Sequence, residues 1–444
     1  MALKKKSTIS NYVRKDIKMK LDVQPLAALC DQKIEIYVSG LAAYSKVKIS
    51  ASMRLPWAKS VLYESFAWFK ADENGQVDLS RQKPEPGGSY DFIDSMGLIV
   101  SMKSKDPKAV EKIGQGISVD EPLFIDITAE CGQERSSAQL QRLFKSKEIR
   151  SLRISDEFVG ELFYSDQPGN KTILWIGGSG SGLGVNAPVA ALLASHGFNV
   201  LSLPFFGEKG LPAQLSEIPL EYFESVFAWL SKNPITSGKE VNILGMSKGA
   251  EVALLLASRY PFISRVAAWA PHAYCFQGLA FKNESSWTYA GKPLPFIRLK
   301  NRWIFADAIG CFIQNKPFGF THTYIKGLEA ARNKEEARIK IEDAQADLLL
   351  FTSKDCGMWN TYAGSLEIMD TLQKCNYPRS YDLVVYEDAG EPYYAPYVIP
   401  AGESKLKMGP RLVLDMGGTL QGNAHAKEDA WQKTIEFFEQ SNKN

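Results

Sequence analysis

The sequence contains little histidine, no paired cysteine motif and no long apolar run. Only four histidines occur among 444 residues, and six cysteines are scattered without Cys-x-x-Cys spacing. This cysteine usage is typical of reduced thiols in a cytosolic-type compartment. No group of His, Cys and Asp has the spacing of metal ligands, so we expect no metal site.

Segments that would direct the chain to a membrane or a secretory route are also missing. No apolar run is long enough to cross a bilayer, and the N-terminal MALKKKSTISNYVRKDIKMK lacks the apolar core of a secretory signal. The final SNKN is not a peroxisomal tripeptide. These absences predict a cytoplasmic protein without a transmembrane segment, while the lysine-rich N-terminus leaves organelle targeting open.

An excess of charge is missing as well. The chain has 52 basic and 50 acidic residues, and a formal net charge of +2 gives no argument for a nucleic-acid partner. Its content of 45% hydrophobic and 23% charged residues is ordinary for a globular protein. The length is sufficient for two domains and possibly three.

The first third of the chain has the texture of a small all-β domain. Residues 1–19 are expected to form a flexible basic tail. Within 20–148, short stretches alternate apolar and polar residues, and clusters of Gly, Pro and Asn separate them. These stretches are KIEIYVSGL, SKVKISASM, SMGLIVSMK and LFIDITAE. Short strands at this spacing favour an immunoglobulin-like β-sandwich.

Residues 149–444 instead alternate apolar strands with helical stretches. Strands are expected in KTILWIGG, NVLSLPFFG, EVNIL, QADLLLFTSKD and YDLVVYEDAG, and helices in PVAALLASHGF, IPLEYFESVFAWLSKN and EDAWQKTIEFFEQ. This alternation predicts a doubly wound, mostly parallel sheet with helices on its faces. The less regular segment at about 277–340, which contains the charged helical stretch KGLEAARNKEEARIKIED toward its end, is expected to be a lid over the sheet.

The most specific local motif is GMSKG, residues 245–249. It matches the Gly-x-Ser-x-Gly nucleophile elbow and lies between a strand and a helix, as that motif requires. Ser247 is therefore the candidate nucleophile, and the backbone N–H of Lys248 is a candidate oxyanion donor. The stretch WIGGSGSGLG predicts the second donor at Gly178 or Ser179, although a glycine-rich turn alone could equally cradle a phosphate.

Longer stretches around these motifs resemble one known family. LLASHGFNVLSLPFFGEKGLPAQLSEIPLEYFESVFAWL, followed by LGMSKGAE, closely resembles the acyl-CoA thioesterase and bile acid-CoA:amino acid N-acyltransferase family. LYESFAWFKADENGQVDL and PGGSYDFIDSMGLIVSM are similar to its N-terminal β-sandwich. The resemblance extends from about residue 20 to the C-terminus and implies an α/β-hydrolase domain preceded by that sandwich.

The resemblance implies cleavage of a long-chain acyl-CoA thioester through an acyl-enzyme. Family members with a serine nucleophile are typically thioesterases, whereas the acyltransferases typically use cysteine, so Ser247 indicates hydrolysis. Coenzyme A would be part of the substrate, and no separate cofactor is expected. Acyl chain length and oligomeric state stay open.

The resemblance also exposes two departures in the triad. The family pattern similar to Gly-x-Asp-Asp-x-x-Trp is SKDCGMW here, so Asp355 remains a candidate acid while Cys356 occupies the second acidic position. Asp355 could equally be a turn residue that caps its own loop. In the stretch YEDAGEPYYAPYVIP, Glu391 stands where the family pattern has its catalytic histidine.

A solvated carboxylate has a pKa of ~4.3 and is a poor base for a serine hydroxyl. His272 and His425 are the candidate replacement bases, and each could instead be structural or solvent-facing. Three hypotheses therefore remain: a thioesterase-like serine hydrolase with a rearranged triad, a non-catalytic acyl-CoA or lipid-binding member, and an amino-acid N-acyltransferase.

Overall fold

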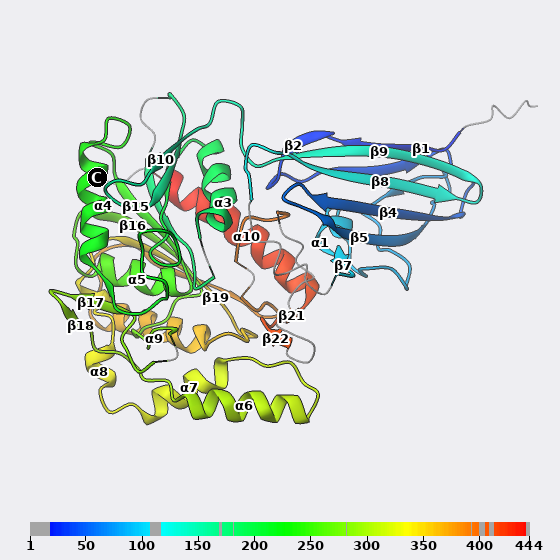
Figure 1. Ribbon diagram of the computed structural model, residues 1–444. Helices are drawn as coiled ribbons and strands as arrows, with labels where there is room; N and C mark the ends of the chain where they lie inside the picture. Colours follow the sequence, from blue (N-terminus) through cyan, green and yellow to red (C-terminus); the bar gives the residue numbers. More distant parts are fainter. Residues whose placement is uncertain are drawn as a thin grey trace, which may run out of the picture.

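The computed structural model describes residues 18–106, 117–167, 171–180, 182–280, 282–391, 393–398, 405–407 and 413–440. Figure 1 shows two bodies side by side, a β-sandwich and an α/β domain. The expected tail lies outside the described residues apart from Lys18 and Met19. Met19 is buried, and its N–H donates to Glu134 at 2.9 Å, so Met19 packs with the sandwich.

The N-terminal domain is a β-sandwich of a six-stranded and a three-stranded sheet. The strand orders are β2-β9-β8-β4-β5-β7 and β1-β3-β6. Val47, Ile49, Ala51 and Met53 of β4 are buried, as the predicted alternation requires. The strands are β1 (Lys20–Gln24), β2 (Ala27–Leu29), β3 (Glu35–Ser39), β4 (Lys46–Leu55), β5 (Ala58–Lys70), β6 (Val77–Asp78), β7 (Lys103–Ser104), β8 (Leu123–Cys131) and β9 (Glu134–Leu143).

One predicted strand of the sandwich is wrong. The stretch SMGLIVSMK forms the short helix α1 (Gly97–Val100), with β7 following it. All four residues of α1 are buried, so the stretch is a continuous apolar run without true alternation. Such a run does not by itself distinguish a strand from a buried helical turn.

The second domain is built on an eight-stranded sheet with the order β10-β11-β13-β12-β15-β16-β19-β20. The strands from β13 to β20 in this order are parallel, whereas β11 is antiparallel to both β10 and β13. The sequence did not indicate the β10–β11 hairpin. The strands are β10 (Arg150–Ile154), β11 (Gly160–Tyr164), β12 (Thr172–Ile176), β13 (Asn199–Ser202), β15 (Val241–Met246), β16 (Ile263–Trp269), β19 (Asp347–Ser353) and β20 (Tyr381–Tyr386).

Helices cover both faces of this sheet, which gives the α/β-hydrolase fold. In β12, Ile173 and Trp175 face the core shared with α3 and α10, whereas Leu174 and Ile176 face the core shared with α4, α5 and α9. Both faces of the central strand are therefore apolar, as a buried parallel strand requires. The helices are α3 (Leu183–Ser195), α4 (Glu221–Lys232), α5 (Lys248–Ala257), α9 (Thr361–Lys374) and α10 (Leu420–Glu439).

A lid of helices and small sheets is formed mainly by the segment between β16 and β19, to which β14 from earlier in the chain adds a strand. Its main helix, α6, was not predicted, and the predicted charged helical stretch is broken into shorter pieces because Ala331 and Arg338 are extended, with ψ of 126° and 133°. The elements are β14 (Ile218–Pro219), β17 (Trp287–Tyr289), β18 (Lys292–Pro293), α6 (Asn301–Ile313), α7 (Thr321–Ala330), α8 (Lys334–Ala337) and the 3₁₀ turn η1 (Ile341–Asp343), with β21 (Lys405–Lys407) and β22 (Val413–Asp415) nearby.

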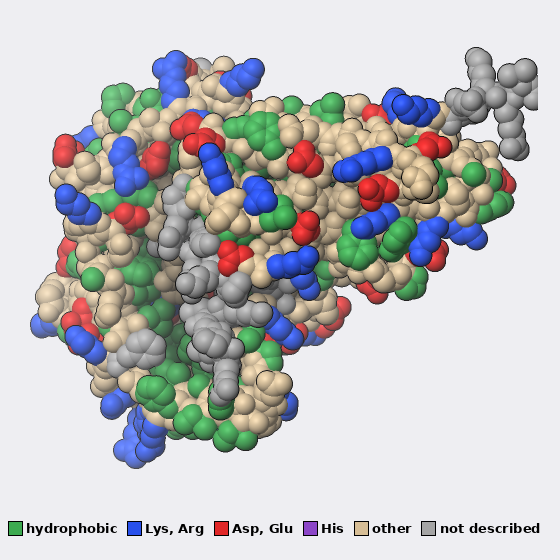
Figure 2. Space-filling model, turned by 45° about the vertical axis from the view of Figure 1, so that its right-hand side comes forward, with side chains coloured by type: hydrophobic (Ala, Val, Ile, Leu, Met, Phe, Trp, Pro, Cys, Tyr) green, Lys and Arg blue, Asp and Glu red, His purple; other side chains and the backbone are tan. Residues whose placement is uncertain are grey.

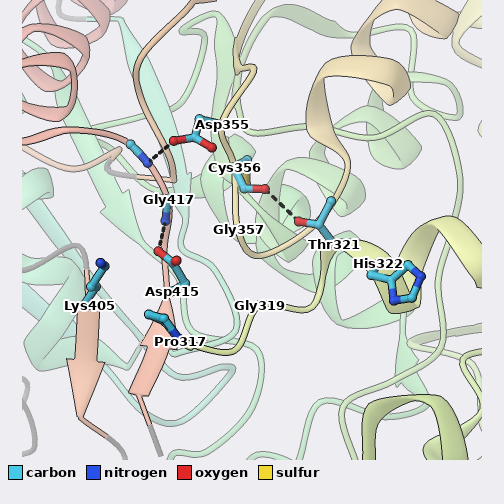
Figure 3. A pocket seen from close by; sticks show the side chains of 11 residues that line it. Pro317, Gly319, Thr321, His322, Asp355, Cys356, Gly357, Lys405, Asp415 and Gly417 are labelled. Atoms are coloured by element: carbon cyan, nitrogen blue, oxygen red, sulfur yellow. Dashed lines mark hydrogen bonds between the residues drawn. The ribbon is translucent and has the colours of Figure 1, made fainter. Parts of the chain in front are cut away.

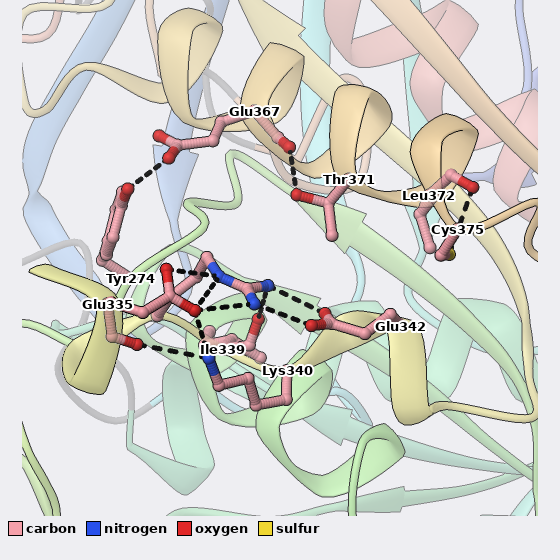
Figure 4. A network of polar contacts seen from close by, with 10 residues as sticks. Tyr274, Glu335, Ile339, Lys340, Glu342, Glu367, Thr371, Leu372 and Cys375 are labelled. Carbon is pink, nitrogen blue, oxygen red and sulfur yellow. Dashed lines mark hydrogen bonds and ion pairs between the residues drawn. The ribbon is translucent and has the colours of Figure 1, made fainter.

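An ion-pair network fixes the C-terminal end of the lid. The Arg338 guanidinium donates to Glu335 at 3.0 Å and to Glu342 at 2.7 Å, and Lys340 also pairs with Glu335 (Figure 4). The hydroxyl of Tyr274, whose backbone forms a bridge to Arg338, donates to Glu367 of α9. These contacts hold Arg338 in the extended conformation that interrupts the helix.

The outer face of α6 is apolar. Phe305, Ile309, Phe312 and Ile313 are more than half exposed, and Figure 2 shows apolar side chains gathered at the lower end of the molecule, where Figure 1 places α6. The only acid of this helix, Asp307, instead accepts from His322 and Thr323 of α7. No helix among the described residues is long and apolar enough to span a membrane.

The two domains share one junction built around Asp31. This buried carboxylate accepts from His196 of the α/β domain at 2.5 Å and from Trp431 of α10 at 2.9 Å. Lys33 pairs with Glu428 of α10 at 2.5 Å. A single apolar core runs from the sandwich strands to α3 and α10, so the two domains pack as one body.

Candidate active site

The GMSKG motif forms a sharp turn between β15 and α5. Ser247 has φ of 53° and ψ of −117°, a strained backbone conformation for a residue with a side chain. A Cβ on Gly249 would lie 2.1 Å from the carbonyl oxygen of Ile176, and a Cβ on Gly245 would lie 2.5 Å from that of Gly249. Gly249 is therefore required for the close approach of the turn to β12, and Gly245 for the close packing of β15 against the first turns of α5.

The turn also places backbone groups around the serine. The N–H of Lys248 is the first of α5, where the helix dipole favours negative charge. The loop after β12 passes so close that a Cβ on Gly178 would lie 3.3 Å from that of Ser247. Ser179 of the same loop and Ser247 line one cavity. Both predicted sources of oxyanion donors thus lie beside the candidate nucleophile.

Glu391 lies directly against Ser247. It is only 5% exposed, and its carboxylate accepts a hydrogen bond from the Cys356 thiol. Burial raises the pKa of Glu391 to about 7, and the nearby Ser247 hydroxyl and Cys356 thiol oppose this rise. Enclosure by protein therefore gives Glu391 a pKa well above that of a solvated carboxylate.

The loop that carries Glu391 is held from two sides. The Glu391 N–H donates to the carbonyl of Met416 at 2.9 Å, and the N–H of Gly390 donates to Asn423 of α10 at 2.9 Å. A Cβ on Gly390 would lie 2.0 Å from the Met416 oxygen, so this position requires glycine. The carboxylate is thus fixed by backbone contacts to the β22–α10 segment.

Cys356, rather than Asp355, contacts Glu391. The Cys356 thiol donates to Oε2 of Glu391 at a sulfur–oxygen distance of 3.8 Å. Burial and the nearby Glu391 charge raise the pKa of the thiol, and the backbone N–H groups of Met358 and Trp359 oppose this rise. Cys356 therefore stays a neutral thiol that can donate to an ionised carboxylate.

Asp355 points to the other side of the loop. It is exposed and accepts from the N–H of Gly418 at 2.9 Å, and Figure 3 shows its carboxylate directed toward the segment at Gly417. Thr321 donates to the Cys356 carbonyl at 2.7 Å in the same region. Asp355 thus fits the turn-capping alternative, and it has no contact with the Ser247–Glu391 pair.

The structure places neither candidate replacement histidine beside Ser247. His272 is buried among Phe276, Trp359 and Tyr274, which lowers its pKa to about 3, and neither ring nitrogen has a hydrogen-bond partner among the described residues. It follows the apolar end of β16 into an aromatic cluster instead of the site.

His425 is exposed on the first turns of α10 and packs its ring against Tyr386, with centroids 6.0 Å apart. His196 and His322 pair with Asp31 and Asp307. All four histidines lie in the described part of the chain, and none hydrogen-bonds to Ser247. The described residues thus contain no Ser-His pair.

The Ser247 cavity, as we call it, opens on the lid side of the nucleophile. Its volume is about 240 Å³, and its wall is predominantly apolar. The side chains lining it come from the lid and from the loop between β19 and α9, and include Leu279, Leu299, Ile304, Phe320, Tyr324, Met358 and Trp359. An apolar cavity that ends at a serine hydroxyl suits an acyl chain whose carbonyl carbon is presented to that hydroxyl.

Family comparisons agree with this architecture. The family model described as "BAAT / Acyl-CoA thioester hydrolase C terminal" matches residues 218–444, which is half of the chain. The chain belongs to this family. The model described as "Acyl-CoA thioester hydrolase/BAAT N-terminal region" matches residues 31–156, which include most of the sandwich.

Individual members of the BAAT/acyl-CoA thioester hydrolase family align over nearly the whole chain. Mouse bile acid-CoA:amino acid N-acyltransferase is 27% identical over 437 residues, covering 95% of this chain and 97% of the relative. Human acyl-coenzyme A thioesterase 1 is 27% identical over 433 residues, covering 94% and 96%. Mouse peroxisomal succinyl-coenzyme A thioesterase is 26% identical over 436 residues, covering 94% and 96%. The cytoplasmic location stays a prediction, since one of these relatives is named as peroxisomal.

The sequence pointed to Ser247 and Glu391 as candidate site residues but did not indicate that Cys356 contacts Glu391. A thiol beside two conventional triad positions gives no signal of its own, because cysteine is a common core residue. The sequence signal that could have revealed this contact is that positions 356 and 391 both depart from the family pattern. A carboxylate has no N–H to donate, whereas a thiol beside it can donate a hydrogen bond to it.

Proposed function

We propose that this protein hydrolyses fatty acyl-CoA thioesters, with Ser247 as nucleophile and Glu391 as general base. The observation that carries the proposal is a buried carboxylate, Glu391, placed close enough to the Ser247 hydroxyl for that hydroxyl to lower its pKa. The family's thioesterases and the apolar Ser247 cavity support the acyl-CoA substrate.

A carboxylate can act as this base because its pKa is near the working pH. The proton-transfer efficiency of a general base is best when its pKa lies close to the operating pH, and burial brings Glu391 to about 7. At neutral pH about half of the molecules then carry the ionised, competent form. A carboxylate with an ordinary pKa of ~4.3 would be ionised but weakly basic.

The leaving group also suits a carboxylate base. A thioester releases a thiolate, and alkyl thiols have a pKa of ~8.5, so the sulfur departs without being protonated first. An amide would release an amine that needs a proton in the transition state, for which an imidazolium is the better donor. The site therefore fits thioesters better than amides.

The proposed reaction has two balanced halves. As the Ser247 oxygen bonds to the thioester carbon, its proton passes to Glu391, and the resulting oxyanion is held by the backbone N–H groups of Lys248 and of the loop at Gly178 or Ser179. Collapse of this intermediate breaks the carbon–sulfur bond and releases coenzyme A as thiolate, which takes the proton from Glu391 and leaves that carboxylate ionised for the second half. Water then attacks the acyl-serine and gives a proton to Glu391, which returns one to the Ser247 oxygen as the fatty acid leaves.

Cys356 acts in this scheme as a positioning residue. Its thiol proton is directed at Oε2 of Glu391 and thereby stabilises the ionised carboxylate. An aspartate at the same place would bring a second negative charge to Glu391 and disfavour that ionised form. A thiol in place of an acid at position 356 thus compensates electrostatically for a glutamate in place of a histidine at position 391.

Thiol release from palmitoyl-CoA tests the proposal. Wild type should release free thiol, and Ser247→Ala and Glu391→Gln should each reduce the rate by about 10²-fold or more. If wild type is no faster than Ser247→Ala, hydrolysis is excluded. Retained binding of palmitoyl-CoA would then identify a non-catalytic acyl-CoA-binding protein. Formation of an acyl-amide with added glycine would instead identify an N-acyltransferase.

A further inference from the structure

A second cavity adjoins the Ser247 cavity at the base of the lid. Its volume is about 390 Å³, and Gln277, Leu299 and Asn301 line both cavities. Four cations stand around the rest of its wall, and we call it the basic cavity: Lys282, Arg298, Lys300 and Arg302. A ligand anchored among these cations could therefore extend directly to the nucleophile.

Most of this positive charge is not neutralised by the protein. Lys282 lies 3.8 Å from Glu284, and that carboxylate also accepts from Ser216 at 2.8 Å. Within the described ranges, no carboxylate lies within ion-pair distance of the other three cations. Lys300 packs over the ring of Trp303 at 4.9 Å. Several uncompensated cations in one concave surface attract and hold an anion.

The N-terminus of α6 adds to this field. The helix begins at Asn301, no side chain caps it by a hydrogen bond, and its first turn contains no acidic residue. Asn301 and Arg302 of that turn line the basic cavity, so the positive end of the helix dipole lies at its edge. Backbone N–H groups at such an end are a common phosphate-binding arrangement.

We propose that the basic cavity binds the phosphate groups of coenzyme A while the acyl thioester occupies the Ser247 cavity. Coenzyme A carries a 5′-diphosphate and a 3′-phosphate monoester, and such a monoester alone has a charge of about −1.5 to −2 at pH 7. The planar forks of Arg298 and Arg302 suit phosphate oxygens, and the two lysines supply point charges. The inference rests on the proposed function for the identity of the ligand.

Calorimetric binding to Ser247→Ala tests this inference without turnover. The probes are coenzyme A, adenosine 3′,5′-bisphosphate and inorganic phosphate. Coenzyme A and the bisphosphate should bind, inorganic phosphate should bind at least about tenfold more weakly, and rising salt should weaken all three. Adding Arg298→Ala and Arg302→Ala should weaken coenzyme A binding by about tenfold or more.

Two control variants make the result specific. Lys83→Ala with Arg135→Ala removes the same kinds of charge from exposed positions of the sandwich and should leave the affinity unchanged. Arg298→Lys with Arg302→Lys keeps the charge and should give intermediate affinity. Unchanged coenzyme A affinity in the double alanine variant overturns the inference, as does equal affinity for inorganic phosphate. Because binding is measured without the nucleophile, it can succeed even if palmitoyl-CoA is not hydrolysed.

Discussion

Replacing Glu391 by glutamine should separate the stability of this site from its activity. The pKa of Glu391 rises from 4.5 to about 7 on folding, chiefly through burial. Between these pH values the folded protein holds the proton more tightly than the unfolded chain does. The free energy of unfolding therefore decreases as the pH rises from about 4.5 to 7, and the loss is complete above pH 7. At ~1.4 kcal/mol per pH unit, it amounts to roughly 3 kcal/mol.

Glutamine is neutral at every pH and avoids this loss. Glu391→Gln should match wild type in stability near pH 4.5 and exceed it by up to ~3 kcal/mol at pH 8. The same change should lower kcat by about 10²–10⁴-fold, because the amide cannot accept the Ser247 proton. Wild-type kcat should rise about tenfold per pH unit below pH 7 and level off above it.

Urea unfolding at pH 5 and pH 8, together with thiol release from palmitoyl-CoA, measures both effects. Glu387→Gln is the matched control, since this exposed glutamate lies in the same loop and pairs with Lys354 at the surface. Equal stability differences at the two pH values would show that Glu391 is not a buried ionising group. A glutamine variant that keeps wild-type turnover would exclude Glu391 as the base.

Three further predictions concern the surroundings of the site. Cys356→Asp should raise the pKa of Glu391 and move the pH–rate profile to higher pH by about one unit or more, whereas Cys356→Ser, which retains a donor, should move it less. Combining Cys356→Asp with Glu391→His should give faster thiol release than either single variant. A double variant no faster than the single variants would refute the coupling between positions 356 and 391. His272→Phe should keep turnover within about twofold and stabilise the protein by ~1 kcal/mol in urea unfolding, because two unpaired buried nitrogens are removed. A large loss of kcat would instead show that His272 takes part in the reaction. Asp31→Ala should destabilise the protein by about 2–4 kcal/mol, because it leaves the Trp431 N–H and His196 without an acceptor. Burial opposes the rise in the pKa of His196, but its bond to Asp31 raises that pKa overall, so this contribution should be complete below about pH 6.5 and disappear as the pH rises through the raised value.

Those parts of the fold whose local pattern is unambiguous could be predicted from the sequence. The β15–α5 turn combines a strand, Gly-x-Ser-x-Gly and a helix, and the structure has all three in order. Long strands with clean alternation, such as β4 and β8, were also recovered. The β10–β11 hairpin was missed because its exposed residues, such as Arg150 and Arg153, hide the strand pattern. Helix α6 was missed because it is apolar toward the cavity and also on its outer face, which removes helical periodicity.

The chemistry of Glu391 could not be predicted in the same way. Its position followed from the family resemblance, but its pKa depends on enclosure by segments far apart in the chain, including Cys356 and the loop at Met416. Burial of this kind is a tertiary property, and no local pattern around residue 391 carries it. For the same reason the sequence suggested His272 as a replacement base, although the structure buries that ring in an aromatic cluster.

The junction at Asp31 has a consequence for how the molecule moves. Because one apolar core and buried hydrogen bonds join the sandwich to α3 and α10, hinge motion between the two domains would break packed contacts. Backbone amides of β4 and β15 should then exchange their hydrogens through the same global opening, with similar protection. The lid, whose helix α6 contains no buried residue, is left as the part that can open at low free-energy cost. Entry of the proposed acyl substrate to Ser247 would in that case be a local event at α6 and α7, with the sandwich remaining docked throughout.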